Sequence, residues 1–251
     1  MDELFSSLPV RRIEEHRLAP LSKDVWPATI PAVRQILDEG LDLSRLTVFV
    51  GENGTGKSTI VEALAQAFGL NAEGGTQNAL HHTQRTESTL AEHLQLTRGA
   101  GGSKKGVFLR AETMHSHFAY LDSVGQSGRH NFQSHGESFL EFVVSRSGIR
   151  GLWVFDEAES ALSFNSSLTF LSVVTDLVHD GSQVVISTHS PIFASLPEAC
   201  LYEAGEWGLR RRRYDELELT QSWRLFLEAP ERFLRYLGSR GAPGRYRHDP
   251  S

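Results

Sequence analysis

Residues 51–59 read Gly-Glu-Asn-Gly-Thr-Gly-Lys-Ser-Thr and match the phosphate-binding pattern G-x-x-x-x-G-K-[ST]. The apolar run 46–50 precedes this stretch and predicts a buried strand, and residues 60–68 follow it with the pattern of a helix. Glycines let the backbone wrap tightly and turn successive N–H groups toward phosphate oxygens, and the helix N-terminus adds partial positive charge. The stretch therefore predicts a binding site for the phosphates of a nucleotide.

The polar groups of this loop have distinct expected roles. We expect Lys57 to reach the β- and γ-phosphates and the hydroxyl of Ser58 to bind Mg²⁺. The alternative is a glycine turn before an ordinary helix. The strand before the motif and the helix after it favour the phosphate-binding interpretation. The residues that we expect to contact the nucleotide here are Gly51, Asn53, Gly54, Thr55, Gly56, Lys57, Ser58 and Thr59.

A second signal lies in residues 151–157, where four apolar residues end in two carboxylates. A buried strand that delivers Asp156 to its C-terminal end places it at the nucleotide crevice of an α/β sheet. Asp156 would bind Mg²⁺, directly or through water, and Glu157 would lie beside the γ-phosphate and polarise the attacking water. The alternative is that this acidic pair caps the helix that follows.

Two further turns carry candidate groups. Residues 187–191 read Ser-Thr-His-Ser-Pro and follow the apolar run 184–186. His189 would therefore face the same crevice and form a hydrogen bond with the γ-phosphate. The alternative is a polar loop histidine. In residues 134–138, Ser134 and Gly136 open a helix and offer a hydroxyl and free N–H groups to an anion, although a simple helix cap fits this turn equally well.

Strands alternate with helices along the chain, which argues for an α/β fold with a mostly parallel sheet. The expected strands are residues 46–50, 107–109, 152–155 and 184–186, and the expected helices are residues 32–39, 60–68, 113–124, 139–145 and 168–178. We further expect a short edge strand at residues 10–13, little structure over 71–106 with a mobile glycine-rich stretch at 99–106, a hairpin over 201–214 and a terminal helix over 222–237.

Composition and charge indicate an ordinary globular domain and bear on whether it binds nucleic acid. The chain has 251 residues, 39% hydrophobic and 22% charged, as in an ordinary globular domain. Its formal net charge of −6 gives no support for nucleic acid as a partner. Arg210 to Arg213 leave that partner open, but acidic neighbours and strand alternation favour a solvated hairpin.

Cysteine content and hydropathy bear on localisation. The single cysteine, Cys200, excludes an intrachain disulfide and fits a reducing cytosol. We see no signal peptide and no run of 18 apolar residues, so we expect a cytoplasmic protein without membrane insertion.

The order of the four motifs, from phosphate loop to Thr-His, resembles the ABC-type ATPase superfamily, which includes transporter nucleotide-binding subunits and SMC- and RecF-like DNA-repair ATPases. In particular, the chain resembles the short, stand-alone bacterial ATPases of the AAA family with an ABC-like core. Residues 108–113 and 228–237 also look like segments of those proteins, and the resemblance covers residues 25–240.

The resemblance implies one ABC-type P-loop NTPase domain over residues 1–251, with an N-terminal antiparallel β portion. It also implies a variable helical sub-lobe over 71–145, which ends in the signature turn, and a frayed tail over 240–251. The implied active unit is a head-to-tail homodimer that sandwiches two ATP molecules, hydrolyses them to ADP and phosphate, and drives an unidentified protein partner.

The resemblance also assigns roles to single residues. Ser134 and Gly136 match the signature turn that contacts the γ-phosphate of the opposite subunit, and residues 159–162 match the loop that crosses the dimer interface. Glu157 matches the catalytic glutamate and His189 the switch histidine; with Lys57 they form the expected catalytic set.

Some positions depart from the family pattern. His135 stands where glycine is usual, and no glutamine follows residues 107–109, so we assign Glu112 as the substitute metal ligand beside Ser58 and Asp156. Trp26 is a candidate for stacking on adenine, although we favour a packing role for it.

These departures keep a second hypothesis open, a nucleotide-gated binding module in which ATP occupancy is the output. A small-molecule kinase fits less well, because it should carry an arginine-rich lid. The interval between phosphate loop and signature turn is too short, and lacks the heptads, for the long coiled coil of the DNA-repair branch.

Overall fold

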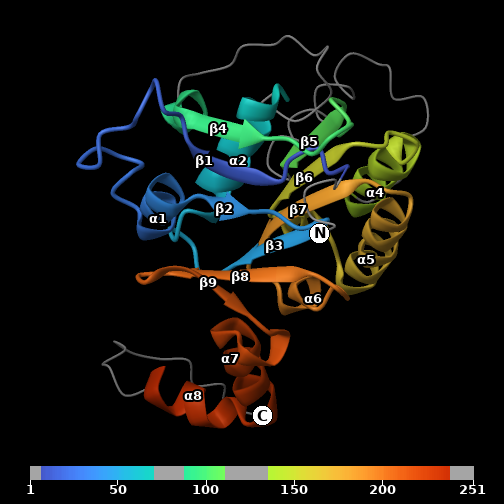
Figure 1. Cartoon of the computed structure of the whole chain (residues 1–251). Helices are drawn as coiled ribbons and strands as arrows, with labels where there is room; N and C mark the ends of the chain where they lie inside the picture. Colours follow the sequence, from blue (N-terminus) through green and yellow to red (C-terminus); the bar gives the residue numbers. More distant parts are fainter. Residues whose placement is uncertain (1–6, 71–87, 111–134, 238–251) are drawn as a thin grey trace, which may run out of the picture.

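A computed structural model describes residues 7–70, 88–110 and 135–237 of the chain (Figure 1). Its centre is a six-stranded sheet with the order β5-β6-β7-β3-β8-β9, in which every neighbouring pair is parallel except the antiparallel β8–β9 hairpin. The strands are β3 (Leu46–Val50), β5 (Gly106–Arg110), β6 (Leu152–Asp156), β7 (Gln183–Thr188), β8 (Cys200–Gly205) and β9 (Gly208–Arg212). The predicted α/β fold with a mostly parallel sheet is therefore confirmed.

Helices cover both faces of this sheet, so its inner strands are buried on both sides and their sequences are almost continuously apolar. On one face, α1 (Pro31–Glu39) and α2 (Lys57–Phe68) pack over Phe49 and Val154. On the other, α4 (His135–Arg146), α5 (Phe164–His179) and α6 (Pro191–Ala194) pack over Val48, Trp153 and Phe155. Alternate residues of each strand thus supply two separate cores.

A second, three-stranded antiparallel sheet lies beside the first, with the order β2-β1-β4. It consists of β1 (Arg12–Glu15), β2 (Leu41–Asp42) and β4 (Leu94–Thr97), and the short 3-10 helix η2 (Thr89–His93) leads into β4. A strand is present near the predicted residues 10–13, but β1 begins at Arg12. The prediction that it is an edge strand is wrong, because β1 lies in the middle of this sheet. Its unpredicted neighbour β4 comes from residues expected to have little structure.

Several other expectations fall within the region of the expected helical sub-lobe. Of its described residues, 88–110 form the 3-10 helix η2 and the strands β4 and β5, with a loop between the two strands, and 135–145 lie in α4. The expected helix over 113–124 lies outside the described residues, as does the tail 240–251. The mobility of residues 99–106 stays a prediction.

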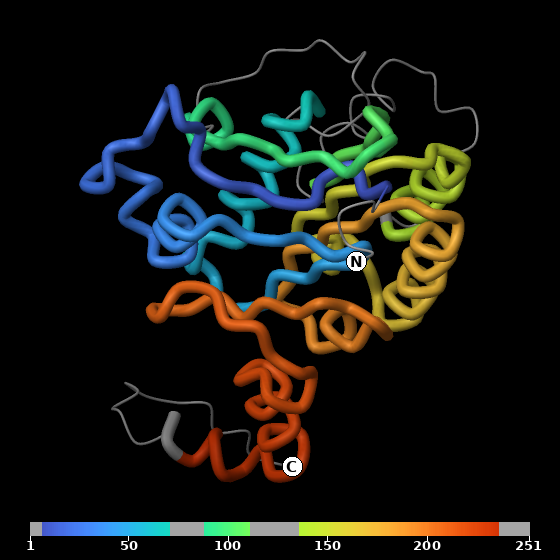
Figure 2. The backbone as a smooth tube through the Cα atoms, viewed as in Figure 1, coloured from blue at the N-terminus to red at the C-terminus, as the bar shows by residue number. Residues whose placement is uncertain are grey.

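The C-terminal part contains the predicted hairpin and two helices instead of one. The 3-10 helix η4 (Ala158–Ala161) follows β6, and η5 (Tyr214–Glu216) follows the hairpin. The last described elements are α7 (Glu218–Glu228) and α8 (Pro230–Leu237). The single helix predicted over 222–237 is wrong because Pro230 lacks an N–H and disfavours a helical conformation at the residue before it. These two helices extend away from the body (Figure 2). Within the described ranges, no helix combines the length and apolar character that crossing a membrane requires.

The basic hairpin strand β9 finds partners within the chain. The Arg210 guanidinium lies 4.8 Å from the centre of the Trp207 ring, Arg212 lies 3.6 Å from a Glu203 carboxylate oxygen, and Arg213 pairs with Asp215. These contacts favour the solvated hairpin that the sequence predicted.

One buried side chain connects the N-terminal segment to the central sheet. Gln183, the first residue of β7, is fully buried, and its amide nitrogen donates to the carbonyl oxygens of Val10 (2.7 Å) and Ser44 (3.0 Å). Its amide oxygen accepts from the N–H of Val10 at 2.8 Å. The backbone N–H and carbonyl of Val10 therefore depend on this one side chain for their hydrogen bonds, whereas the Ser44 carbonyl also accepts from the Thr47 hydroxyl at 3.5 Å.

We expect Gln183→Leu to lower the free energy of unfolding by about 2–4 kcal/mol, because it leaves the buried backbone N–H and carbonyl of Val10 without partners. Urea denaturation followed by circular dichroism measures the change. Gln221→Leu is the matched control, since the exposed Gln221 donates only to the Asp215 carbonyl, and should change stability by less than about 0.5 kcal/mol. Equal effects of the two substitutions would contradict the role given to Gln183.

Candidate active site

The phosphate loop connects β3 to α2, and two of its glycines are sterically required. Gly56, immediately before α2, has φ +95°, and a Cβ atom there would lie 2.7 Å from Cγ2 of Ile30. At Gly51 a Cβ atom would lie 2.5 Å from the Ala204 carbonyl oxygen on β8. Only glycine fits such close approaches, so the loop is held tightly between α1 and the sheet.

Lys57 is the first residue of α2, and its side chain is buried. Its ammonium donates to the Glu52 carbonyl oxygen at 2.8 Å. Burial lowers the pKa of Lys57, and the nearby carboxylates of Glu157, Glu159 and Asp156 oppose that shift only in part. The ammonium therefore lies in a dry, mostly acidic setting.

Sheet register brings the predicted motifs together at one edge. Val50, directly before the phosphate loop, lies opposite Thr188, and Asp156 lies opposite Ser187. Because β3, β7 and β6 are adjacent and parallel, the phosphate loop, the acidic pair and the Thr-His turn all leave the sheet at neighbouring carboxyl ends. This convergence is the arrangement that the sequence predicted.

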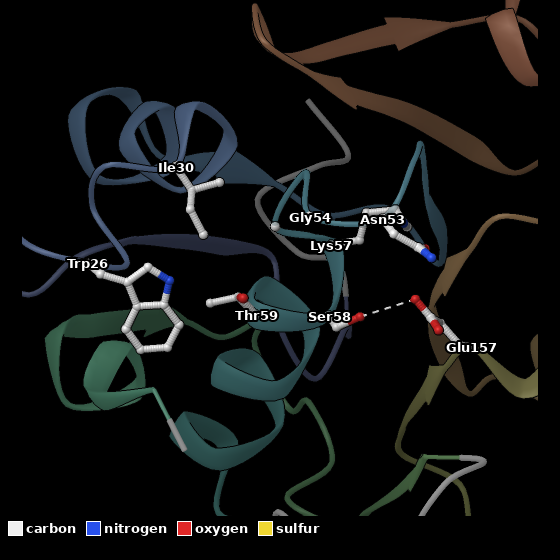
Figure 3. A pocket seen from close by; sticks show the side chains of 9 residues that line it. Trp26, Ile30, Asn53, Gly54, Lys57, Ser58, Thr59 and Glu157 are labelled. Carbon is white, nitrogen blue, oxygen red and sulfur yellow. Dashed lines mark hydrogen bonds between the residues drawn. The ribbon is translucent and has the colours of Figure 1, made fainter. Parts of the chain in front are cut away.

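A cleft of about 260 Å³ opens beside the loop (Figure 3). Glu157 reaches across it from the end of β6, and the Ser58 hydroxyl donates to its carboxylate at 3.5 Å. Trp26 forms part of the wall and is 57% exposed, so the packing role that the sequence favoured for it is wrong. The lining residues are Trp26, Ile30, Asn53, Gly54, Gly56, Lys57, Ser58, Thr59 and Glu157.

Other predicted residues lie near this cleft without lining it. The Thr55 hydroxyl donates to the Glu52 carbonyl within the loop, and Gly51 packs against β8. Gly136 lies in the first turn of α4, where an added Cβ atom would lie 2.9 Å from the Ala161 carbonyl oxygen. Ser134 and Glu112 lie outside the described residues.

The backbone at Glu157 is unusual. Glu157 has φ +49°, a left-handed conformation that is uncommon for a residue with a side chain and costs on the order of 1 kcal/mol. Although Glu157 is the N-cap of η4, its side chain makes no capping hydrogen bond. The capping alternative therefore does not account for this carboxylate, which instead contacts Ser58 in the cleft.

Asp156 is held by two side chains. One carboxylate oxygen accepts from Nε of Arg110 at 2.9 Å, and the other accepts from the Ser187 hydroxyl. Arg110 also donates to Glu62 of α2 at 2.8 Å. Burial opposes the charged guanidinium, but the two carboxylates outweigh this effect and raise the pKa of Arg110. Sequence reasoning missed Arg110, although its place at the end of an apolar strand was a usable signal.

The groups at this edge suit Mg²⁺. Among residues 7–70, 88–110 and 135–237, no group of three or more His, Cys, Asp or Glu side chains could hold a metal by itself. Mg²⁺ usually takes one or two protein oxygens together with water and substrate phosphates. The Ser58 hydroxyl beside Glu157, with Asp156 one residue before Glu157 at the end of β6, fits such a partial set.

His189 leaves the sheet directly after β7 and is 45% exposed on its side chain. It does not line the cleft. Instead its backbone N–H donates to Glu159 at 2.7 Å, and its Nδ1 lies 3.4 Å from the same carboxylate oxygen. Glu159, expected in an interface loop, is thus directed inward to the end of β7.

A glycine-rich loop between β3 and α2, with an acidic pair on a parallel strand nearby, is the arrangement of a P-loop nucleotide-binding fold. Residues 29–146, a little under half of the chain, match the model of a family described as an AAA domain. The match confirms the resemblance to P-loop ATPases that the sequence predicted. No curated protein matches the sequence.

Solved structures that are similar to this chain share 15% sequence identity with it. One is PCH-2 of C. elegans, with a TM-score of 0.35 over 64% of this chain and 35% of that one, so the match spans about a third of PCH-2. Another is an SMC head domain from Thermotoga maritima (TM-score 0.37, 69% and 93%). A third is a chain described as a metal-chelate type ABC transporter in an inward-facing conformation (TM-score 0.36, 70% and 75%).

We expect Lys57→Met to weaken ATP binding about 10- to 100-fold, because it removes a charged hydrogen-bond donor from a dry site. Isothermal titration calorimetry with Mg-ATP measures the dissociation constant. Lys105→Met, at an exposed lysine of the β4–β5 loop, is the control and should bind ATP as the unaltered protein does. An unchanged dissociation constant for Lys57→Met would exclude this loop as the phosphate site.

Proposed function

We propose that this protein hydrolyses ATP to ADP and phosphate in a Mg²⁺-dependent reaction, within a head-to-tail homodimer that drives or gates an unidentified protein partner in the cytoplasm. The observation that carries the proposal is the contact between Ser58 and Glu157 across the cleft beside Lys57. It places a hydroxyl, a carboxylate and an ammonium from two parallel strand ends around one space.

Each group has a chemical task in this proposal. Lys57 neutralises charge on the β- and γ-phosphates, and the loop N–H groups bond the phosphate oxygens. Glu157 orients a water for in-line attack on the γ-phosphorus and accepts its proton. Ser58 and Asp156, with Glu112 as a further candidate, would hold Mg²⁺, which supplies further neutralisation of phosphate charge when bound.

Two features support a site that is shared between subunits. The cleft of about 260 Å³ is smaller than the roughly 300–1,000 Å³ of usual ligand pockets, so one subunit encloses little of a nucleotide. Gly136 packs against η4 and does not line its own subunit's cleft. A signature turn at Ser134 and Gly136 would therefore act on a nucleotide held by the opposite subunit.

Glu157→Gln tests the hydrolysis step. The substitution keeps the side-chain shape but removes the basic carboxylate, so we expect ATP binding within about 3-fold of normal and hydrolysis at least about 100-fold slower. We also expect an ATP-trapped dimer in size-exclusion chromatography. Glu206→Gln, at an exposed glutamate of the β8–β9 turn, is the control for phosphate release. Phosphate release at the normal rate from Glu157→Gln would refute the catalytic role.

The second candidate function is a nucleotide-gated binding module with little turnover. It is favoured by the Asp156 carboxylate, both of whose oxygens already accept hydrogen bonds, from Arg110 and Ser187. These donors compete with Mg²⁺ for the same lone pairs. Size-exclusion runs with and without Mg-ATP, beside a phosphate-release assay, separate the two functions, since dimerisation without phosphate release indicates the gate.

Trp26 is proposed to stack on the adenine ring, since it stands exposed in the cleft wall. Stacking of a base on an aromatic ring contributes about 1–3 kcal/mol, so Trp26→Ala should weaken ATP binding about 5- to 100-fold. Binding of inorganic tripolyphosphate, which has no base, should stay unchanged. Trp223→Ala, at an exposed tryptophan of α7, is the control. Equal losses for ATP and tripolyphosphate would point to loop distortion instead.

A further inference from the structure

The Glu159 carboxylate is buried at the end of β7 and gathers three groups on one oxygen. Its Oε1 accepts from the Thr188 hydroxyl at 2.6 Å and from the His189 backbone N–H at 2.7 Å. The same oxygen lies 3.4 Å from Nδ1 of His189. The carboxylate thus contacts both the backbone and the ring of the residue that follows the strand.

The second oxygen, Oε2, has the opposite character. It is buried and has no hydrogen-bond partner among the described residues. Burial raises the pKa of Glu159, which means that the surroundings penalise its charge. A buried carboxylate oxygen without a partner costs free energy, which offsets part of what the two hydrogen bonds at Oε1 contribute to stability.

Glu159 also lies within the electrostatic field of the phosphate site. Its carboxylate is among the groups that stabilise the charged form of Lys57. Thr188, which it binds, lies opposite Val50, the last strand residue before the phosphate loop. The contact with His189 therefore occurs at the same sheet edge as the phosphate loop.

We infer that Glu159 is a positioning residue for His189: it holds the Nδ1 side of the imidazole and leaves Nε2 as the accepting nitrogen that faces the nucleotide and its attacking water. This inference rests on the proposed function. A carboxylate beside Nδ1 favours the neutral ring that carries its proton on Nδ1. The hydrogen bond made by one ring nitrogen of a histidine decides which of the two nitrogens is protonated.

The first test is spectroscopic and needs no nucleotide. In protein labelled with ¹⁵N-histidine, the His189 signals are identified by their loss in His189→Gln. We expect the Nδ1–H form in the unaltered protein and a shift toward the Nε2–H form, which free imidazole favours, in Glu159→Gln and more fully in Glu159→Ala. Glu206→Gln should leave the spectrum unchanged. Unchanged His189 signals in both Glu159 variants would overturn the inference.

The second test is kinetic. Because the ring would be misoriented while the phosphate loop stays intact, Glu159→Gln should lower kcat about 10- to 100-fold and change the dissociation constant for ATP by less than about 3-fold. Gln has nearly the same volume as Glu, so this variant should fold even if Glu159→Ala does not. A normal kcat in Glu159→Gln would overturn the positioning role.

The two proposals fail separately. If Glu157→Gln hydrolyses ATP normally, the proposed catalytic role of that glutamate fails. The nucleotide-free His189 spectrum still decides whether Glu159 fixes the ring.

Discussion

The in-register parallel pairing of β6, β7 and β3 is the constraint on which the rest of the structure depends. It sets Asp156 opposite Ser187, and Thr188 opposite Val50, so that three connecting loops start at one edge of the sheet. The strands are apolar along almost their whole length because helices bury both faces. Polar residues are therefore concentrated where the strands end, and the chemistry of the molecule is concentrated there too.

Charge at this edge is closely paired rather than solvated. Arg110 donates to both Asp156 and Glu62, and Lys57 is buried near several carboxylates. Each cation therefore lies beside carboxylates rather than in bulk water. Desolvation of such groups is costly unless each has a partner. A triphosphate would add negative charge where an acidic cluster already surrounds one ammonium. Binding of the proposed nucleotide at this edge would therefore depend on the loop N–H groups and a divalent cation as well as on Lys57.

Sequence patterns predicted the parts of this fold that depend on local chemistry. The phosphate loop, the parallel strands β3, β5, β6 and β7, and the β8–β9 hairpin follow from apolar runs and turn residues. Pro230 was a visible signal for the break between α7 and α8. Patterns did not reveal β4 or the central place of β1, because these short strands gain their stability from each other across more than 80 residues, as in the pairing of Ile13 with Leu96. The inward turn of Glu159 likewise depends on a contact with β7 that spacing does not encode.

Gln183 is the first residue of β7, and His189 directly follows its last residue. At its start, β7 is fastened by amide hydrogen bonds to Val10 and Ser44, which belong to the segments that flank the small antiparallel sheet. Since an extended strand has a nearly fixed rise per residue, β7 fixes the distance between these hydrogen bonds and the backbone of His189. Because β7 is paired with β6 and β3 along its length, the hydrogen bonds at its start and the turn at its end belong to one rigid strand in the middle of the sheet.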